Sequence, residues 1–144
     1  MNTDQAIQPS DLDEAWKIAL TARKNAYAPY SQFKVGAALK LVGKDTIIPG
    51  CNVENASYGA TICAERSAIV SACTQFGKLQ IAYVVIVTEE SKPTVPCALC
   101  LQVIAEFSTP DTLVFSGNEA GITGQWHFKE LLPKPFTSFE QDHA

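Results

Sequence analysis

Hydrophobic and polar residues alternate along the chain with two different periodicities, one typical of helices and one typical of strands. Between Leu12 and Tyr27 the apolar residues recur at every third or fourth position, which is typical of a helix with one buried face. We expect this helix to begin at Ser10, because Asp13 follows three residues later and the pair approaches the pattern of a capping box. Pro29 prevents the helix from continuing further.

The period changes to two from Phe33 to Leu41, where larger apolar residues alternate with lysines and small residues. Gly-Lys-Asp then predicts a turn into residues 46–53, so the two segments are expected to form a β-hairpin. Helical spacing returns over residues 64–76 and ends where Gly77 can supply a left-handed cap. The wholly apolar run 81–87 predicts a strand that is buried on both faces.

A further helix and strand follow in the last third of the chain. Pro96 fits the opening turn of a helix that reaches Phe107, residues 112–116 predict a strand, and residues 127–133 predict a short helix. A strand, a helix and a strand in succession imply a right-handed crossover and a parallel pair. We therefore expect an α/β fold with a mixed sheet and helices on both faces.

Length and charge narrow the function classes. The 144 residues, 47% of them hydrophobic, suffice for one domain over 1–144, with a polar lead (1–9) and a polar tail (137–144). The formal net charge is −4 and the basic residues form no stripe, so we expect no nucleic-acid partner. The longest apolar stretch, 81–87, is far shorter than the roughly 20 residues that a membrane-spanning helix needs, so no membrane partner is expected.

The cysteine content adds a chemical expectation. The acidic N-terminal segment has the features of neither a signal peptide nor a transit peptide, so we expect a cytoplasmic protein. Because the cytosol keeps thiols reduced, the five cysteines are better explained as metal ligands, catalytic groups or core residues than as disulfides.

Three of the cysteines can converge on one point. Cys63 directly precedes one predicted helix, and Cys97 and Cys100 stand in the first turn of another. Residues three apart share a helix face, so the second pair can direct both sulfurs toward one ion. Helix N-termini favour the thiolate, which is the form that binds zinc. The spacing therefore predicts a zinc site.

The number of ligands separates a catalytic zinc site from a structural one. Catalytic sites usually have three protein ligands and leave the fourth position to water, whereas structural sites have four. In an open site, Glu65 is the nearest acid able to carry the proton of that water, and Arg66 can donate hydrogen bonds to the sulfurs and offset their charge. Cys63 must then lie at the extreme end of its helix, since residues two apart otherwise point in different directions.

The cysteines could also serve in a closed site, in redox chemistry or in the core. A closed structural zinc site could be completed by Cys51, Cys73 or His127. A redox pair of Cys97 and Cys100 would leave Cys63 and Glu65 without roles. Simple core packing is the other alternative, and composition alone would favour it for any single cysteine. Cys51 and Cys73 are flanked by apolar positions and are expected to be core residues.

Four segments resemble a known family. Cys-Ala-Glu-Arg at 63–66, followed by Pro-Cys-x-x-Cys at 96–100, resembles the signature of zinc nucleoside deaminases in its three-cysteine form. Residues 27–38 and 50–59 are similar to the small, homotetrameric cytidine deaminases, and the likeness extends to residues 131–136. The resemblance implies a three-layer α/β/α sandwich around a mixed sheet of about five strands.

The resemblance also implies an activity. Cys63, Cys97 and Cys100 would hold one Zn²⁺ per subunit, and Glu65 would carry the proton of zinc-bound water to N3 of cytosine and then to the departing amine, while hydroxide attacks C4. The reaction would be the hydrolytic deamination of cytidine and deoxycytidine in pyrimidine salvage, and modified cytosine nucleosides are a further class of substrate.

The implied substrate-binding residues are Phe33, Asn52, Glu54, Tyr58, Ala64 and Phe136. Asn52 and Glu54 would hydrogen-bond the sugar, particularly its 3′-hydroxyl, and Phe33 would line the pocket wall. Tyr58 and Phe136 match aromatic residues that reach the site of a neighbouring subunit, so the resemblance implies a homotetramer with shared active sites.

One segment departs from the family pattern. Many relatives have Pro-Cys-Gly-Ala-Cys-Arg-Gln where this chain has Pro-Cys-Ala-Leu-Cys-Leu-Gln. Leu101 replaces a second arginine near the sulfurs, Ala98 and Leu99 are bulkier than the usual residues, and Arg66 is left to compensate the charge alone.

Two other functions remain as alternatives. A deaminase that acts on a base within RNA or single-stranded DNA would share the zinc chemistry but needs a basic, aromatic-lined channel, which the negative net charge does not favour. A non-enzymatic module stabilised by zinc would need a fourth protein ligand.

Overall fold

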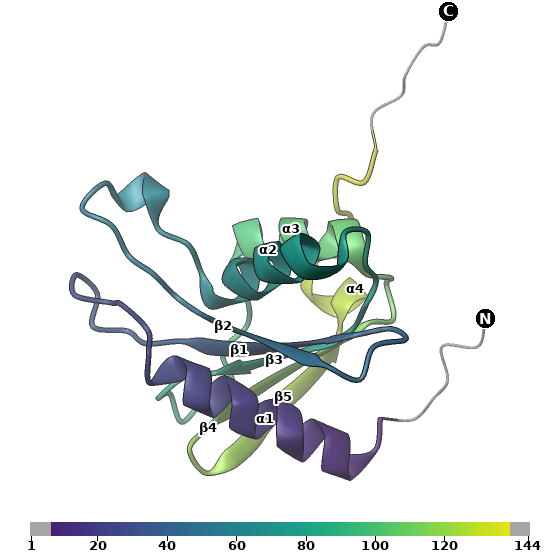
Figure 1. Cartoon of the computed structure of the whole chain (residues 1–144), viewed down its shortest axis with the longest axis horizontal. Helices are drawn as coiled ribbons and strands as arrows, with labels where there is room; N and C mark the ends of the chain where they lie inside the picture. The colour runs from purple at the N-terminus through teal and green to yellow at the C-terminus, as the bar shows by residue number, and fades with distance from the viewer. Residues whose placement is uncertain (1–6, 139–144) are drawn as a thin grey trace, which may run out of the picture.

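The protein forms a five-stranded sheet between two layers of helices (Figure 1). The structure is a computed structural model that describes residues 7–138, so most of the expected polar lead and tail lies outside the described residues. The helices are α1 (Pro9–Arg23), α2 (Ala64–Phe76), α3 (Ala98–Phe107), α4 (Phe128–Leu131) and the 3₁₀ turn η1 (Tyr58–Ala60). The strands are β1 (Gly36–Leu41), β2 (Ile47–Cys51), β3 (Ile81–Val87), β4 (Leu113–Asn118) and β5 (Gly121–His127).

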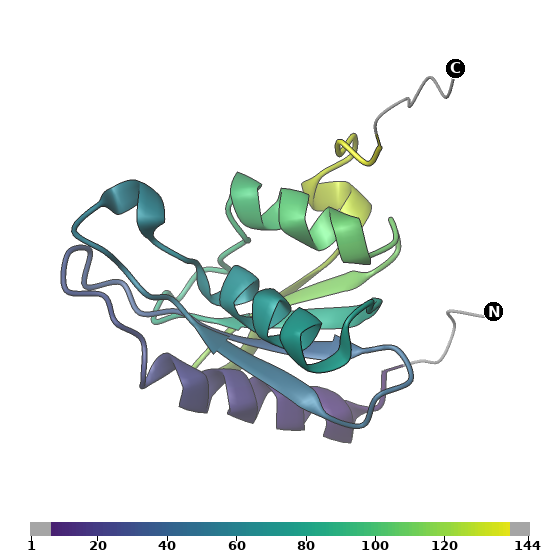
Figure 2. The same ribbon diagram turned by 45° about the horizontal axis from the view of Figure 1, so that its top comes forward.

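The strand order is β2-β1-β3-β4-β5. The β1–β2, β1–β3 and β4–β5 pairs are antiparallel, and β3 and β4 are parallel, with Val85 opposite Phe115. The mixed sheet and the parallel pair expected from the strand–helix–strand succession are therefore confirmed. α1 covers one face, and α2, α3 and α4 cover the other (Figures 1 and 2). This is the expected three-layer arrangement.

Strand β3 shows why a continuous apolar run is needed at the centre of the sheet. Tyr83, Val85 and Val87 pack in the cluster under α1, whereas Val84 and Ile86 pack in the cluster under α2 and α3. Side chains of a strand alternate between the two faces, and here both faces are covered by helices.

The first helix differs from the sequence expectation at both ends. It begins at Pro9, with Gln8 as a cap residue that makes no side-chain hydrogen bond, so the capping box expected from Ser10 is wrong. Proline has the backbone angle that the first helical turn requires. The helix ends at Arg23, because Tyr27 instead bridges Val53 in an extended conformation.

Two strands also differ from expectation. β1 begins at Gly36 and not at Phe33, since the preceding backbone bonds to a side chain of the segment that follows β2. β5 could not be located from the pattern, because its burial is only partial and glycines interrupt it. Gly121 opens the strand at φ 138°, in the region that favours glycine.

Two loops lie side by side at one end of the sheet (Figure 1). Residues 24–35 connect α1 to β1, and residues 52–63 connect β2 to α2. Val53 joins the two loops, since it bridges Tyr27 on one side and Ile62 on the other. Among the described residues, no helix has both the length and the apolar character needed to cross a membrane.

Candidate active site

The N-termini of α2 and α3 bring three sulfurs together. Cys63 is the cap residue of α2, Cys97 is the cap residue of α3, and Cys100 lies in the first turn of α3. Their sulfur atoms all lie within 4.8 Å of one another, and Cys63 Sγ is 3.8 Å from Cys97 Sγ. Both cap residues have extended backbone angles, so the requirement that Cys63 lie at the extreme helix end is confirmed.

Close packing of α2 on β2 places Cys63. A Cβ atom on Gly50 would lie 2.3 Å from the carbonyl oxygen of Ala64 and 2.6 Å from the backbone nitrogen of Ala68. Only glycine allows the first turn of α2 to approach the strand this closely. Ala64, which the resemblance placed in the substrate-binding set, is fully buried there.

Buried hydroxyl groups anchor the loop that carries Cys97. The backbone N–H of Thr94 donates to Ser116 Oγ at 2.8 Å, and the hydroxyl oxygens of Thr94 and Thr88 lie 3.2 Å apart. Thr88, which directly follows β3, and Ser116, which lies within β4, are both buried. These residues were missed at the sequence level, because serine and threonine in strands carry no signal that distinguishes an anchor from an ordinary position.

Glu65 lies against the sulfur cluster. Its side chain is only 6% exposed, and Cys100 Sγ donates a hydrogen bond to Glu65 Oε2 at 3.4 Å. Burial raises the pKa of this carboxyl above its ordinary value, with the charge of Cys63 acting in the same direction. An acid that is itself shielded from bulk water therefore borders the three sulfurs.

Arg66 provides the positive charge. Its Nη2 atom lies 3.5 Å from Cys63 Sγ and 3.4 Å from the carbonyl oxygen of Thr61, and its Nε atom is buried with no hydrogen-bond partner. The pKa of Cys63 falls to about 5, chiefly because of its side-chain interaction with the thiol of Cys100, with Arg66 and Cys97 adding to the effect. The pKa of Cys100 is raised, because it retains the proton that the pair shares.

The donor set fits zinc. Three thiols lie within reach of one ion, and the two that cap helix N-termini, one of them facing an arginine, stand where the thiolate is favoured. Among the described residues, the only group positioned as possible metal ligands is these three cysteines. His127 instead caps α4, and Cys73 packs against the core, so neither belongs to the cluster. Cys51 is half-buried at the end of β2 and also lies outside the cluster.

The two proposed sugar ligands occupy the joined loops. Asn52 is buried, with Oδ1 accepting the Val35 N–H at 2.8 Å and Nδ2 donating to the carbonyl of Phe33 at 2.8 Å. Glu54 accepts hydrogen bonds from the backbone N–H groups of Tyr30 and Ser31, at 2.9 and 3.0 Å, and from the Ser31 hydroxyl. The hydroxyl bond is the main reason that the pKa of Glu54 lies below its ordinary value.

The two aromatic candidates lie on the surface of the single chain. Tyr58, in η1, is 74% exposed and meets the ring of Tyr30 edge-on at 5.6 Å between centroids. Phe136 is 59% exposed, and its backbone is held by Gln102, whose amide donates to the Phe136 carbonyl at 2.6 Å and accepts from its N–H at 3.2 Å. Gln102 was not identified from the sequence.

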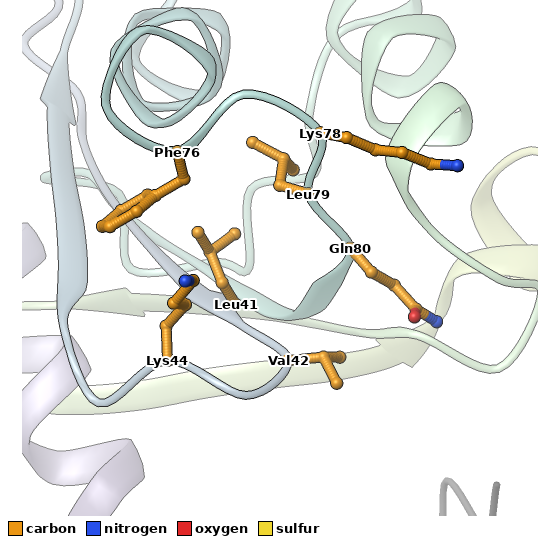
Figure 3. Close-up of a pocket in the computed structure, with 7 residues that line it drawn as sticks. All are labelled: Leu41, Val42, Lys44, Phe76, Lys78, Leu79 and Gln80. Atoms are coloured by element: carbon orange, nitrogen blue, oxygen red, sulfur yellow. The ribbon is translucent and has the colours of Figure 1, made fainter.

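A separate groove lies at the opposite end of α2 (Figure 3). It has a volume of about 250 Å³, and its lining includes Leu41, Phe76 and Leu79. α2 has 13 residues, so at about 1.5 Å per residue this end lies roughly 20 Å from Cys63. Lys44 stands 5.0 Å from the centre of the Phe76 ring. The groove therefore does not belong to the sulfur cluster.

Comparisons with known proteins agree with the site. The family model described as "Cytidine and deoxycytidylate deaminase zinc-binding region" matches residues 9–116, which include all three cysteines. A cytidine deaminase of Halalkalibacterium halodurans is 44% identical over 85% of this chain and 91% of that protein. A cytidine deaminase of Mycoplasma pneumoniae is 42% identical over 91% of this chain and 98% of that protein.

A solved structure supports the same assignment. The crystal structure of cytidine deaminase from Burkholderia pseudomallei superposes with a TM-score of 0.79 at 39% identity, covering 86% of this chain and 98% of the other. Together with the cluster of Cys63, Cys97 and Cys100, the zinc-binding family match identifies Zn²⁺ as the cofactor. The chain belongs to the family of zinc-dependent cytidine and deoxycytidylate deaminases.

Proposed function

We propose that the protein hydrolyses cytidine to uridine and ammonia, and that it accepts deoxycytidine in the same site. The observation that carries the proposal is the buried carboxylate of Glu65 in hydrogen-bond contact with a cluster of three possible metal ligands. Three ligands leave a coordination position for water, whereas a structural zinc site would use a fourth protein ligand.

The metal and the acid divide the chemistry between them. Cys63, Cys97 and Cys100 would hold Zn²⁺, which would supply the Lewis acidity that makes water easier to deprotonate at neutral pH. Glu65 takes one proton of the attacking water and delivers it to N3 of the cytosine ring as the new C4–O bond forms. It then takes the remaining proton from the C4 hydroxyl and gives it to the amine, so that the C4–N bond breaks, ammonia leaves and the C4 carbonyl of uridine forms. Its burial beside Cys100 keeps solvent from competing for this proton.

The other residues bind, orient and compensate charge. Arg66 offsets the negative charge of the thiolates through its contact with the sulfur of Cys63. Glu54 and Asn52 contact the sugar from the joined loops, and Phe33 lines the wall beside the base. The backbone of Phe33 is tied to Asn52 by a 2.8 Å hydrogen bond, which supports a common role for the two residues.

The active site is completed by assembly in this proposal. Tyr58 and Phe136 are large aromatic residues that stand mostly exposed on a single chain, and burial in a homotetramer would cover them. Each would then reach the site of a neighbouring subunit. Light scattering would measure the assembly, and a Tyr58→Ala variant that remains tetrameric should bind nucleoside more weakly. The protein is proposed to act in the cytoplasm, where nucleosides are salvaged.

A direct assay tests the function. Purified, zinc-loaded protein is mixed with cytidine or deoxycytidine, ammonia release is followed, and zinc content is measured in the same sample. The Glu65→Ala variant is the matched control, because it removes the proton carrier and leaves the three sulfurs in place. Absence of release above that control would refute the proposal. Faster deamination of an oligonucleotide than of the free nucleoside would favour the nucleic-acid alternative.

A further inference from the structure

We propose that Ser31 is a positioning residue for sugar recognition. Its hydroxyl, which accepts the N–H of Phe33, orients the carboxylate of Glu54 and so sets how strongly the enzyme selects for the 3′-hydroxyl of the nucleoside. The inference rests on the proposed function, in which Glu54 binds that hydroxyl.

The Ser31 hydroxyl takes part in two hydrogen bonds at once. It donates its only hydrogen to Glu54 Oε2, and its oxygen accepts the N–H of Phe33 at 3.0 Å. One atom therefore connects the acid expected at the sugar with the residue expected at the base. The Phe33 N–H therefore helps to fix the direction in which the Ser31 hydroxyl donates to Glu54.

The second carboxylate oxygen is held by the backbone. Glu54 Oε1 accepts the N–H of Tyr30 at 2.9 Å and the N–H of Ser31 at 3.0 Å. With these two bonds alone, the carboxylate could still rotate about Oε1. The bond from the Ser31 hydroxyl fixes Oε2 as well, and so determines the plane of the group.

The carboxylate of Glu54 can accept one more hydrogen bond. An ionised carboxylate has about four lone-pair sites, and three are occupied by the backbone of Tyr30 and the backbone and hydroxyl of Ser31. The remaining site is available to a sugar hydroxyl. Its direction is set by the other three bonds, because they orient the group from which it projects.

The loop adopts an unfavourable backbone conformation that supports this arrangement. Gln32 has φ 57°, in the left-handed region that residues with a side chain rarely occupy. Its N–H donates to the carbonyl of Ala28 at 2.9 Å, which closes the turn. The opposite loop is held in register, since Tyr27 N–H donates to the Asn52 carbonyl at 3.0 Å and Glu54 N–H donates to the Tyr27 carbonyl at 2.8 Å.

The test compares two substrates across a small set of variants. KM and kcat are measured for cytidine and for 3′-deoxycytidine with the zinc-loaded wild type, Ser31→Ala, Ser31→Thr, Glu54→Ala and the double variant. Ser31→Ala should raise KM for cytidine about tenfold, because it removes a hydrogen bond to a charged group. Its kcat should stay within about twofold, and its KM for 3′-deoxycytidine should hardly change.

Rescue and coupling distinguish positioning from a general structural role. Ser31→Thr retains the hydroxyl and should restore most of the affinity for cytidine. In the Glu54→Ala background, Ser31→Ala should have no further effect on KM, because the group that it positions is absent. Ser91→Ala, at an exposed serine of another loop, is the matched control and should behave as the wild type.

Each contrary result has a defined meaning. An equal rise in KM for both substrates, or a further loss in the Glu54→Ala background, would overturn the positioning role of Ser31. So would a Ser31→Ala variant that binds cytidine as tightly as the wild type while Glu54→Ala discriminates between the substrates. If the wild type fails to deaminate cytidine, or if Glu54→Ala treats both substrates alike, the proposed function or its assignment of Glu54 fails instead.

Discussion

Replacement of Arg66 by alanine tests the charge balance of the zinc site. Three thiolates on a divalent ion leave one net negative charge, and Arg66 is the cation that faces them, with Nη2 at 3.5 Å from Cys63 Sγ. At an effective dielectric constant of about 20, two unit charges at this distance interact with about 5 kcal/mol. This value is an upper limit, because the zinc ion itself repels the guanidinium and desolvation opposes the pair.

Changes in residues that support metal ligands typically lower metal affinity by about 10- to 100-fold, or about 1.4–2.7 kcal/mol, which is below this limit. We expect Arg66→Ala to weaken zinc binding by that factor while the fold is retained. Its buried Nε makes no hydrogen bond, so its removal leaves no new unpaired partner at that atom. The zinc dissociation constant is measured by competition with a chromophoric chelator.

Two further variants make the measurement specific. Arg66→Lys keeps the charge but loses the planar fork, and should fall between the wild type and the alanine variant. Arg23 is the other arginine of the chain and pairs with Glu89 and Glu119, away from the sulfurs, so Arg23→Ala should leave zinc affinity unchanged. If Arg66→Ala binds zinc as tightly as the wild type, the helix N-termini alone stabilise the thiolates and the charge argument is refuted.

Three more variants probe the site and its supports. Glu65→Gln should retain zinc but lower kcat by at least about 100-fold, since a positioned proton carrier accelerates a reaction on the order of 10²–10⁴-fold. Both kcat and zinc content are measured, and a zinc-loaded variant with wild-type kcat would contradict the role of Glu65. Gly50→Ala should destabilise the protein by about 1–3 kcal/mol in urea unfolding, because its Cβ would lie 2.3 Å from a backbone oxygen of α2. Gly59→Ala, with no neighbouring atom within 4 Å, is its control, and equal stability of the two variants would refute the close-approach argument. The hydrogen bonds of Ser31 lower the pKa of Glu54 from its ordinary value of 4.5. The ionised carboxylate therefore stabilises the fold fully at pH values above 4.5, and this contribution is lost as the pH falls through the lowered pKa. The Tm difference between the wild type and Glu54→Gln should therefore shrink in acid, and a difference that grows there would contradict the assignment.

The central elements of the fold were predictable because local pattern and tertiary environment agree. The expected range 64–76 coincides with α2, and 81–87 coincides with β3, since helical spacing and a continuous apolar run each fit one environment. β5 lies at the edge of the sheet with most of its side chains partly exposed, so its residues carry no clear alternation. Two helix-start signals overlap at the beginning of α1, a proline at residue 9 and a possible capping box at Ser10. The helix starts at the proline.

The site was predictable to the extent that its geometry is local. Helix positions alone place Cys63, Cys97 and Cys100 at two N-termini, and this is where the structure has them. The hydrogen bonds of Ser31 and the left-handed conformation of Gln32 depend on the contact between two loops. The spacing of residues along the chain does not predict such a contact. The resemblance to a family drew attention to Glu54 but not to the residue that orients it.

The short separation of two of the sulfurs has a consequence for handling the protein. Cys63 Sγ and Cys97 Sγ lie 3.8 Å apart, so an approach of about 1.8 Å would bring them to the length of a covalent sulfur–sulfur bond, roughly 2.05 Å. Such a bond and zinc ligation are mutually exclusive, because both require the same electron pairs. Cys97 is exposed, so oxidants can reach it. Metal-free preparations therefore need a reductant before zinc is restored.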